Sequence, residues 1–504
     1  MQKTDKIAIL GFGVEGKAMC EYLLKHGYID VTVCDQSEKV EGLAVGVGFR
    51  GGADYLRALS DFDVVFRSPG ISFFRAEIAE LVDDPDSQTE VSSMTKYFFE
   101  HCRVPVVGVT GTKGKGTTAS LITEMLRRSG RKVFLGGNIG VPAVNFLDEM
   151  SEDALVVLEL SSFQLIDLEV SPHIAVVLNV TSEHLDYHAS VEEYHESKYP
   201  IMAHQVEGDF AVLNADYPYR TEFLELGAGR KFYVSCKFED VNGVWVGVHG
   251  QTDWETISDG LSRALTADAS VPRAVYYLGY EDADPRERYP RHNYAKVIDA
   301  AEIALLGRHN WENVLPAVVV ARELGVNDMV IAEVLRTFHG LPHRLEPVGR
   351  VDDAGVAFYN DSFSTTPESC LAACNAFNEI GKPFYLIAGG SEKGSDFTAL
   401  GWRLSQMKFL RGVFLMGPSG ARIGEAVRIG HHACVEDGTV CRLPVECVAV
   451  EGLREAMEKA YGEAQNLGTE AVILMSPAAA SFNEFKNYKE RGEKFREIVR
   501  ELEG

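Results

Sequence analysis

Long apolar runs are absent from this sequence of 504 residues. No stretch reaches the ~18 consecutive apolar residues that a bilayer-spanning helix requires, so we expect no membrane partner. The apolar run Ile7–Leu10 is short, and glycines and Glu15 follow it instead of a signal-peptide cleavage site. The nine cysteines are scattered and form no repeated CxxC pair, which is typical of reduced thiols. We therefore expect a soluble, cytoplasmic protein without disulfides.

Basic residues are scarce relative to acidic ones. The chain has 49 Lys and Arg against 74 Asp and Glu, which gives a formal net charge of -25 at pH 7. This sign opposes binding to a phosphate backbone, so no nucleic-acid partner is expected. Small anionic substrates remain possible, because a local cluster of Arg, Lys and backbone N–H groups acts at short range.

Length and patterning indicate several α/β domains. The chain exceeds the ~250–300 residues at which a single core stops growing. Short runs rich in Val and Ile alternate with longer helical patterns, as in KIAILG, VTVCD, DVVFRS, VPVVGVT, ALVVLEL and HIAVVLNV, which predicts parallel sheets covered by helices. Breaks near Phe98–Val104 and Gly340–Arg350 divide the pattern, and we interpret the irregular stretch Lys237–Asn293 as an exposed insertion. The predicted domains are residues 1–100, 101–340 and 341–504.

The first glycine-rich turn, GFGVEG, lies between a predicted strand at Lys6–Leu10 and a helix that begins near Gly16. Gly11 and Gly13 permit a tight turn, and the helix N-terminus offers N–H groups to a diphosphate. Asp35, at the end of the next predicted strand, can accept hydrogen bonds from a ribose or a base. Taken alone, the turn leaves three interpretations open. It could bind the cofactor of a nicotinamide-dependent dehydrogenase, it could bind another diphosphate nucleotide, or it could be a purely structural Rossmann turn.

The second glycine-rich segment, GVTGTKGKGTT at Gly108–Thr118, follows an apolar strand and opens a helix, which is the context of a phosphate loop. The strict pattern is not met, because Val109 replaces its first glycine and Gly116 follows Lys115 where Ser or Thr is usual. Thr117 would therefore supply the hydroxyl for Mg²⁺. The predicted phosphate-binding residues are Gly111, Thr112, Lys113, Gly114, Lys115, Gly116, Thr117 and Thr118.

A series of further motifs follows in the order GNIG, LELSSFQL, NVTSEHLD, Lys198, GRHN with Asn313, GLPHR, NDS, GGSEKGSDF and SPAAASF. Together with the compressed GTxGK loop, this series resembles the muramyl ligase family over essentially the whole chain. The resemblance implies a Rossmann-like N-terminal domain that holds UDP, a central P-loop ATPase-type α/β domain, and a C-terminal Rossmann-like α/β domain.

The activity implied by this resemblance is ATP-dependent amide-bond formation through an acyl phosphate. The last two motifs are similar to those of members that join D-glutamate to UDP-N-acetylmuramoyl-L-alanine in peptidoglycan synthesis. The implied ligands are therefore ATP, Mg²⁺ at two sites, UDP-N-acetylmuramoyl-L-alanine and D-glutamate, and we expect a monomer.

The resemblance also implies roles for individual residues. Lys115, Glu159, His184 and Lys198 would be catalytic, and the metal ligands would be Thr117, Glu159, His184 and Lys198. Because an ammonium cannot bind Mg²⁺, we hypothesise that Lys198 is carbamylated. The remaining implied contacts are Asn310, Asn313, Arg344 and Asp361 for ATP; Gly11, Gly13, Gly16, Asp35, Ser68, Asn138, Ser161 and Gln164 for the UDP-sugar; and Thr365, Lys393, Ser481, Phe482 and Tyr488 for D-glutamate.

Two departures and several alternatives accompany this interpretation. The order Lys115-Gly116-Thr117 resembles folylpolyglutamate synthases, and Phe363 stands where many D-glutamate ligases have lysine. Another amino-acid ligase of this superfamily, a nicotinamide-dependent oxidoreductase and a nonenzymatic nucleotide sensor are the alternatives. We interpret Tyr187-His188 and Tyr194-His195 as packing residues.

Overall fold

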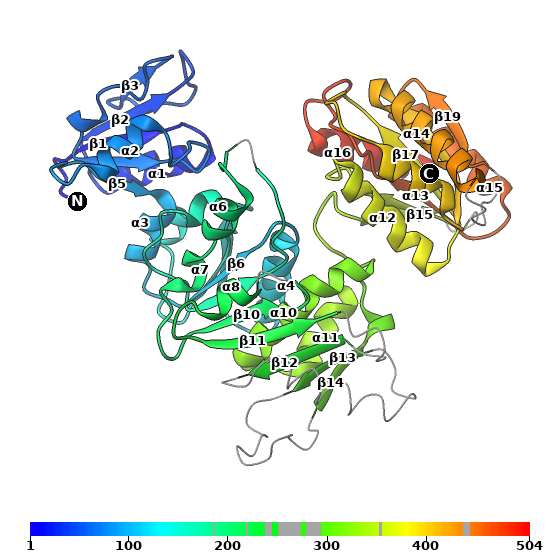
Figure 1. Cartoon of the computed structure of the whole chain (residues 1–504), viewed down its shortest axis with the longest axis horizontal. Helices are drawn as coiled ribbons and strands as arrows, with labels where there is room; N and C mark the ends of the chain where they lie inside the picture. The colour runs from blue at the N-terminus through cyan, green and yellow to red at the C-terminus, as the bar shows by residue number, and fades with distance from the viewer. Residues whose placement is uncertain are drawn as a thin grey trace. The chain divides into compact units, whose positions relative to one another are not determined.

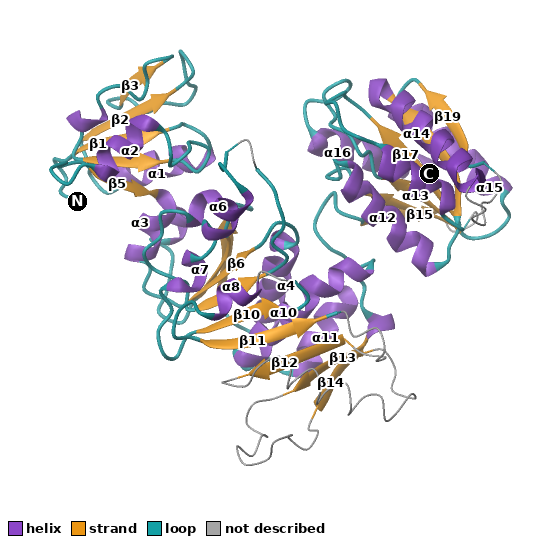
Figure 2. Ribbon diagram, in the orientation of Figure 1, coloured by secondary structure: helices purple, strands orange, loops and turns teal. Residues whose placement is uncertain are grey.

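The computed structural model describes residues 1–184, 187–217, 220–236, 244–249, 274–278, 294–351, 355–436 and 444–503. Its contacts define two compact units, neither of which is one continuous segment. The larger unit comprises Met1–Glu302 and Glu312–Leu335, and the smaller unit comprises Ile303–Trp311 and Arg336–Gly504. Both combine sheets with covering helices, which confirms the α/β class (Figures 1 and 2).

The first sheet of the larger unit contains five parallel strands among the described residues, in the order β3-β2-β1-β4-β5. The strands are β1 (Lys6–Leu10), β2 (Asp30–Asp35), β3 (Gly48–Gly51), β4 (Val64–Arg67) and β5 (Glu90–Ser93), and the helices are α1 (Val14–Lys25), α2 (Ala76–Asp83) and α3 (Met94–His101). The last four residues of β1 are buried, which explains its continuous apolar run. Sequence patterning missed β3 and β5, because GFRG and EVSS contain few apolar residues.

The second sheet of the larger unit has the order β14-β13-β12-β11-β10-β9-β6-β8-β7 in the described part of the chain. Its strands are β6 (Val106–Thr110), β7 (Val133–Gly137), β8 (Leu155–Glu159), β9 (Ile174–Val177), β10 (Phe210–Asn214), β11 (Arg230–Ser235), β12 (Val244–His249), β13 (Ala274–Leu278) and β14 (Tyr294–Asp299). The strands from β7 to β11 pair in parallel, whereas β12 and β14 each pair with one neighbour in antiparallel. The predicted insertion at Lys237–Asn293 is therefore corrected in part, because β12 and β13 within it extend the sheet; its other residues lie outside the described ranges.

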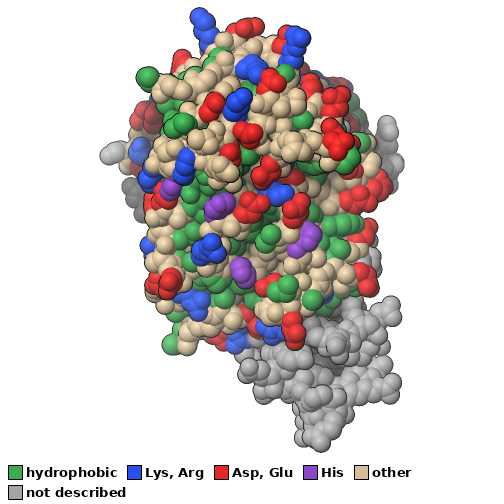
Figure 3. All heavy atoms as spheres, turned by 90° about the vertical axis from the view of Figure 1, so that its left-hand side faces the viewer, with side chains coloured by type: hydrophobic (Ala, Val, Ile, Leu, Met, Phe, Trp, Pro, Cys, Tyr) green, Lys and Arg blue, Asp and Glu red, His purple; other side chains and the backbone are tan. Residues whose placement is uncertain are grey.

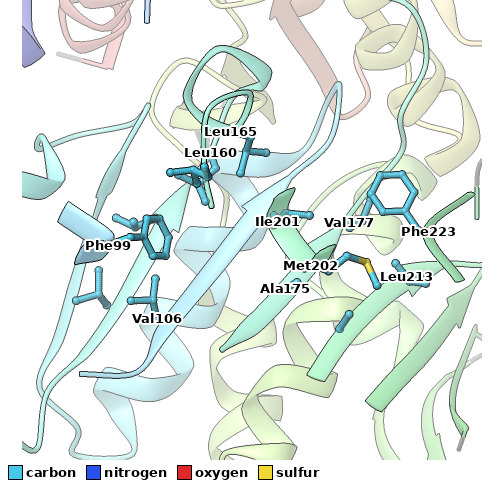
Figure 4. Close-up of a cluster of buried hydrophobic side chains, with 14 of the residues drawn as sticks. Phe99, Val106, Leu160, Leu165, Ala175, Val177, Ile201, Met202, Leu213 and Phe223 are labelled. Atoms are coloured by element: carbon cyan, nitrogen blue, oxygen red, sulfur yellow. The ribbon is translucent and has the colours of Figure 1, made fainter. Parts of the chain in front are cut away.

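Helices cover this second sheet and enclose its apolar core. They are α4 (Lys115–Arg128), α5 (Ser162–Leu165), α6 (Val191–Glu196), α7 (Pro200–Ala203), α8 (Arg220–Leu224), α10 (Trp311–Glu323) and α11 (Asp328–Thr337). Figure 4 shows part of the core, where Phe99 and Val106 lie near one end of the view and Leu213 and Phe223 near the other. Burial of these side chains stabilises the sheet. The loops that follow β6 and β8 begin at the carboxyl ends of its strands.

The sheet of the smaller unit has the order β15-β16-β20-β17-β18-β19 among the described residues. Only β15 pairs in antiparallel within this described sheet. The strands are β15 (Glu346–Val351), β16 (Val356–Asn360), β17 (Phe384–Gly389), β18 (Leu410–Met416), β19 (Glu446–Val450) and β20 (Ala471–Met475), and the helices are α12 (Pro367–Ile380), α13 (Thr398–Gln406), α14 (Gly417–Glu436), α15 (Leu453–Asn466) and α16 (Tyr488–Glu503). A capping box of Thr366 and Ser369 with Pro367 starts α12, and Gly381 at φ 80° ends it.

The three sheets fall one each within residues 1–100, 101–340 and 341–504, although the first two belong to one compact unit. The division into three functional domains therefore stays a prediction. On the face drawn in Figure 3, acidic and basic side chains are interspersed. In the described ranges, no helix combines the length and the apolar character of a transmembrane span.

Candidate functional site

The first glycine-rich turn connects β1 to α1 in a geometry that only glycine fits at two positions. Gly11 has φ 84°, in the left-handed region. A Cβ on Gly16 would lie 2.0 Å from the carbonyl oxygen of Gly11, so any side chain would displace the backbone. Gly13 is the N-cap of α1 and provides no side-chain cap, which leaves first-turn N–H groups available to an anion.

Asp35 and Ser68 hold this turn in place. Both carboxylate oxygens of Asp35 accept backbone hydrogen bonds at 2.8 Å, one from Phe12 and one from Ser37. Desolvation opposes ionisation of Asp35, but these hydrogen bonds outweigh it and lower the pKa of the carboxyl group. The Ser68 hydroxyl donates to the carbonyl oxygen of Gly11 at 3.1 Å. Both predicted ligand contacts are thus also structural parts of the turn.

Gln164 connects the turn to the short helix α5. Its side-chain oxygen accepts hydrogen bonds from the backbone N–H and the hydroxyl of Ser161, each at 3.1 Å, in a capping box. Its side-chain nitrogen donates to Glu15 Oε1 at 2.7 Å. These contacts bring together two predicted UDP-sugar residues and Glu15, which is 149 positions away from Gln164.

A buried ion pair lies beside this contact. Arg67 is fully buried and donates to a carboxylate oxygen of Asp167 at 2.9 Å. It also donates to the carbonyl oxygen of Phe163 at 2.9 Å and to that of Ile71 at 3.0 Å. The Tyr187 hydroxyl lies 3.3 Å from the same guanidinium, so the predicted packing residue Tyr187 completes a polar network.

Two residues predicted for different ligands, Asn138 and Glu159, contact each other. The Asn138 side chain donates to Glu159 Oε1 at 2.7 Å, and its backbone N–H donates to the Glu159 carbonyl oxygen at 2.9 Å. Glu159 ends β8 and is buried. This contact fixes the Glu159 carboxylate at the sheet edge where the phosphate loop begins.

The segment Gly108–Thr118 forms the predicted strand-loop-helix connection between β6 and α4. Gly111 at φ 146° and Gly114 at φ 88° adopt conformations that favour glycine. A Cβ on Gly114 would lie 2.0 Å from Asn313 Oδ1, so the predicted residue Asn313 packs directly on the loop. No side chain caps the N-terminus of α4 at Gly114, which leaves backbone donors for a phosphate group.

Lys115 curls back over this loop. Its Nζ donates to the carbonyl oxygens of Gly111 and Thr112, each at 3.0 Å. The Thr112 hydroxyl forms a hydrogen bond with the Tyr194 hydroxyl at 3.0 Å and accepts another from the backbone of Thr181 at 2.9 Å. Tyr194 is buried, as expected of a packing residue, but its hydroxyl also shapes the phosphate loop.

Lys198 has an unusual environment for a lysine, because it is only 1% exposed. Its Nζ lies 4.3 Å from the centre of the Tyr194 ring. Burial lowers the pKa of Lys198 well below its ordinary value, and the charge of Lys115 lowers it further, against the opposing effect of Glu183. The structure thus brings the predicted catalytic residues Lys115 and Lys198 into one electrostatic cluster.

His184 is exposed and has an uncommon backbone φ of 58°. Its Nε2 is 3.8 Å from a carboxylate oxygen of Glu183, and its ring centre is 4.9 Å from that of Phe163. Glu183 also forms an ion pair with Lys113. The neighbouring residues 185 and 186 lie outside the described ranges.

The smaller unit contains the other predicted ligand residues. Arg344 lies between two non-glycine residues with positive φ, His343 at 63° and Leu345 at 44°. Its guanidinium carbon is 3.8 Å from the centre of the Phe363 ring. Asp361 is buried and accepts from the Leu345 backbone at 3.1 Å and from the Ser476 hydroxyl at 2.6 Å. Burial raises the pKa of Asp361 to about 6 despite these hydrogen bonds.

Lys393 and Phe482, predicted for the amino-acid substrate, lie together on the surface of this unit. The Lys393 Nζ is 5.2 Å from the Phe482 ring centre, and Phe482 is 64% exposed. Ser481, which precedes Phe482 in the sequence, is buried. Tyr488 begins α16, and its ring centre lies 5.0 Å from that of Phe363. The last two predicted residues also belong to this unit: Thr365 is half-buried, and Asn310 donates to the carbonyl oxygen of Leu306 at 2.7 Å.

Sequence reasoning missed three groups that touch the predicted residues. Glu183 was part of a quoted motif without a role, Tyr194 was assigned to packing, and Glu15 was only a spacer in the first turn. Spacing gives no sign of the contacts of Tyr194 and Glu15, because their partners lie 82 and 149 positions away. A charged residue inside a glycine-rich turn is the only sequence feature that could have pointed to Glu15.

Comparison with protein families gives a match to the Mur ligase middle domain over residues 109–255. A UDP-N-acetylmuramoylalanine--D-glutamate ligase from Symbiobacterium thermophilum is 36% identical to this chain, and the match covers 99% of this chain and 98% of the relative. A relative of the same name from Acetivibrio thermocellus is 34% identical, with 99% and 97% covered.

Solved structures agree at the level of the fold. The UDP-N-acetylmuramate-alanine ligase MurC of Thermotoga maritima matches with a TM-score of 0.53 at 17% identity, over 99% of this chain and 100% of that chain. MurF ligase from Thermotoga maritima, solved in complex with ADP, matches with a TM-score of 0.54 at 16% identity, over 100% of both chains. At these identities the comparison establishes the shared architecture alone.

Proposed function

The chain belongs to the Mur ligase family, and on that premise we propose that it joins D-glutamate to UDP-N-acetylmuramoyl-L-alanine in an ATP-dependent step of peptidoglycan synthesis. The observation behind this proposal is the 36% identity to a ligase of that specificity over 99% of the chain. Transfer of the γ-phosphoryl group of ATP to the substrate carboxylate gives an acyl phosphate and ADP. The amino group of D-glutamate then attacks the acyl carbon, an amide bond forms, and phosphate leaves. The family match and the relatives give no support to the oxidoreductase interpretation of the first turn.

The phosphate loop is suited to ATP. Gly111 and Gly114 carry no side chain and adopt loop conformations that favour glycine, and the uncapped start of α4 leaves backbone N–H groups for a phosphate. Lys115 currently satisfies its ammonium with two loop carbonyl oxygens, which a phosphate oxygen can replace. The loop therefore offers donors and one positive charge to a triphosphate, and we assign Gly111–Thr118 and Asn313 to ATP binding.

The residues beside the loop also fit Mg²⁺, a hard cation that prefers oxygen ligands. Thr117 supplies a hydroxyl and Glu159 a carboxylate held by Asn138. The bound ion supplies charge neutralisation for the phosphates. Of the chain's own residues, Lys115 would balance the negative charge of the transferred group.

For Lys198 we propose carbamylation by CO₂. The reaction requires the neutral amine, and burial of Lys198 favours that form by lowering its pKa. The nitrogen of the neutral amine bonds to the carbon of CO₂ as one C=O π bond opens, and one N–H proton passes to solvent water. The product is a carbamate whose negative charge suits the neighbouring Lys115. The carbamate oxygens would serve as hard ligands for a second Mg²⁺, to which we also assign His184. The Lys198→Ala variant is expected to be inactive and partly rescued by short carboxylic acids; an undiminished rate in this variant would rule the carbamate out.

The other assignments concern substrate binding. We propose that Gly11, Gly13, Gly16 and the neighbouring polar residues Asp35, Ser68, Asn138, Ser161 and Gln164 bind the UDP-sugar. Thr365, Lys393, Ser481, Phe482 and Tyr488 would bind D-glutamate, where the Lys393 ammonium suits a carboxylate. Arg344, Asn310 and Asp361 would contact ATP. We further propose that the protein acts as a cytoplasmic monomer.

One assay tests the proposed function. ADP release is measured with UDP-N-acetylmuramoyl-L-alanine and each of D-glutamate, L-glutamate, L-alanine and glycine in turn. Release that requires D-glutamate supports the proposal. Release that requires L-alanine or L-glutamate instead would assign the chain to another branch of the superfamily, and NADH binding without ADP release would reinstate the dehydrogenase interpretation.

A further inference from the structure

His188 is buried in the larger unit and forms a hydrogen bond through each nitrogen of its ring. Its Nδ1 lies 2.9 Å from Glu193 Oε1, and its Nε2 lies 3.0 Å from the Ser162 hydroxyl. The second carboxylate oxygen of Glu193 accepts from the Ala189 backbone N–H at 2.8 Å. Because a carboxylate only accepts hydrogen bonds, Nδ1 carries a proton and donates to Glu193. The imidazole is therefore held from both sides.

The sequence of contacts from Ser162 through His188 to Glu193 has the geometry of a hydrolase triad, in which a base between a hydroxyl and a carboxylate activates the hydroxyl. Burial opposes that role here. Ser162 and His188 are each only 2% exposed, so the hydroxyl is shielded from a substrate. A buried polar chain whose members are all hydrogen-bonded instead makes the elements that it joins rigid relative to each other.

Three aromatic rings surround the imidazole of His188. Phe163 stacks on it, with ring centres 5.6 Å apart and planes at 14°, and Tyr194 meets it at 69° with centres 5.3 Å apart. The Tyr187 ring centre lies 5.0 Å away. Because aromatic contacts have preferred geometries, these rings fix the plane of the imidazole, while the two hydrogen bonds fix its rotation within that plane.

On one side, the hydrogen bond of His188 leads to the first glycine-rich turn. Ser162 begins the four-residue helix α5, which Ser161 caps. Gln164 in the same helix donates to Glu15 Oε1 in the turn at 2.7 Å. The contact between His188 and Ser162 therefore fixes the start of the helix that contacts this turn.

On the other side, the hydrogen bond of His188 leads to the phosphate loop. Glu193 belongs to α6, and the next residue of that helix is Tyr194. The Tyr194 hydroxyl lies 3.0 Å from the hydroxyl of Thr112 in the loop, and the Tyr194 ring centre lies 4.3 Å from Lys198 Nζ. The contact between His188 and Glu193 therefore fixes the helix whose side chain contacts the loop.

We propose that His188 is a positioning residue that sets α5 and α6 against each other, and thereby holds the first glycine-rich turn and the phosphate loop in the geometry that binds their ligands. All the residues of this chain of contacts belong to the larger unit. The inference rests on the proposed function for the identity of the two ligands, a UDP-sugar and ATP. It gives His188, which the sequence predicted as a packing residue, a role beyond packing.

Binding titrations with ADP and, separately, with UDP-N-acetylmuramoyl-L-alanine test this role. His188→Phe keeps an aromatic ring for the neighbouring rings but removes both hydrogen bonds. Each Kd is expected to rise about threefold or more, an effect typical of a residue that acts on a ligand through other residues. A residue that serves stability alone would lower the free energy of unfolding in urea titrations and leave both Kd values of the folded protein unchanged.

Ser162→Ala breaks one of the two hydrogen bonds and perturbs the structure less. In the wild-type background it should raise both Kd values about threefold. In the His188→Phe background, where the partner is already gone, the same change should cost less than about 1.5-fold. Should His188→Phe not fold, Glu193→Ala takes its place in the cycle, because it removes the acceptor on the other side of the ring.

Thr89→Val is the matched control. The Thr89 hydroxyl is buried and donates to the carbonyl oxygen of Phe62 at 2.7 Å. Thr89 precedes β5, so it lies at the amino ends of the parallel strands of the first sheet, opposite the turn that follows β1. This variant loses a buried hydrogen bond in the same unit and should leave both Kd values unchanged.

Three results would overturn the inference. The first is that both Kd values stay unchanged in the folded variants, and the second is an equal loss from Ser162→Ala in both backgrounds. The third is covalent labelling of Ser162 by a fluorophosphonate, which would make it an accessible nucleophile. The proposed function fails separately, because the wild-type protein then binds no UDP-N-acetylmuramoyl-L-alanine. The ADP titrations of the same variants still decide the role of His188 in that case.

Discussion

Glu15 provides a test of the site geometry. Its carboxyl group belongs to the first glycine-rich turn and accepts a hydrogen bond from Gln164 in α5. Desolvation raises the pKa of Glu15 from 4.5 to about 7, although the hydrogen bond from Gln164 and the charge of Arg67 lower it; Asp167 adds a small further rise. The protonated form of Glu15 is thus favoured in the folded protein below about pH 7. We predict that Glu15→Gln, which keeps an acceptor oxygen for Gln164, stabilises the protein at alkaline pH.

The magnitude follows from the pKa difference. One pKa unit corresponds to about 1.4 kcal/mol, so ionisation of Glu15 costs the folded state about 3 kcal/mol once the pH is well above 7. Because the folded-state pKa is the higher one, the stability from protonated Glu15 is fully present below pH 4.5 and is lost as the pH rises through about 7. The advantage of Glu15→Gln should therefore be below about 1 kcal/mol at about pH 5 and approach 3 kcal/mol at about pH 8.

The measurement is the free energy of unfolding from urea titrations followed by circular dichroism at both pH values. Glu21→Gln is the matched control, because Glu21 lies exposed on the same helix α1 and the same charge is removed there. This control should change stability by less than about 0.5 kcal/mol at either pH. An advantage of Glu15→Gln that is equal at the two pH values would refute the burial argument.

Three further outcomes are expected. Gly16→Ala places a methyl group against the carbonyl oxygen of Gly11, so KM for the UDP-sugar should rise at least about tenfold while KM for ATP stays unchanged in steady-state assays. Arg67→Met leaves Asp167 buried without its partner and should lower the free energy of unfolding by about 3–5 kcal/mol in urea titrations. A substitution of Met for any exposed arginine should lower it by less. Tyr194→Phe removes one neutral hydrogen bond to the phosphate loop, and ATP titration should show an affinity loss of about fivefold; an unchanged affinity would mean that this hydroxyl does not shape the loop.

The sequence predicted those features that short-range rules determine. Gly111 and Gly114 occur in the phosphate loop because their backbone angles require glycine, and Lys115 begins the helix as its place in the motif predicts. The buried strand β1 was recognisable because its apolar run is continuous. These features depend on neighbours in the chain, so spacing is enough to reveal them.

Other features depend on the folded state and were not predictable from spacing. The strands β12 and β13 are an exception, because their own residues, VWVGVH and AVYYL, are apolar and rich in Val and Tyr. The charged, proline-rich stretch that follows β13 led to the interpretation of the whole region as an insertion. The contact of Gln164 with Glu15 joins the helices α5 and α1, which are 149 positions apart at this contact. Only the folded structure shows that Lys198 is buried beside Tyr194.

The interleaving of the two compact units has a consequence for protein engineering. The chain passes from the larger unit to the smaller at Ile303, returns at Glu312, and leaves again at Arg336. Consider a chimera with a related ligase that is made by one crossover at any of these points. One of its units would then contain segments from both parent proteins. Exchange of the smaller unit therefore requires simultaneous transfer of the nine-residue segment 303–311 and everything from 336 onward. Natural recombination would face the same requirement, so the two units are expected to share one ancestry along their whole length.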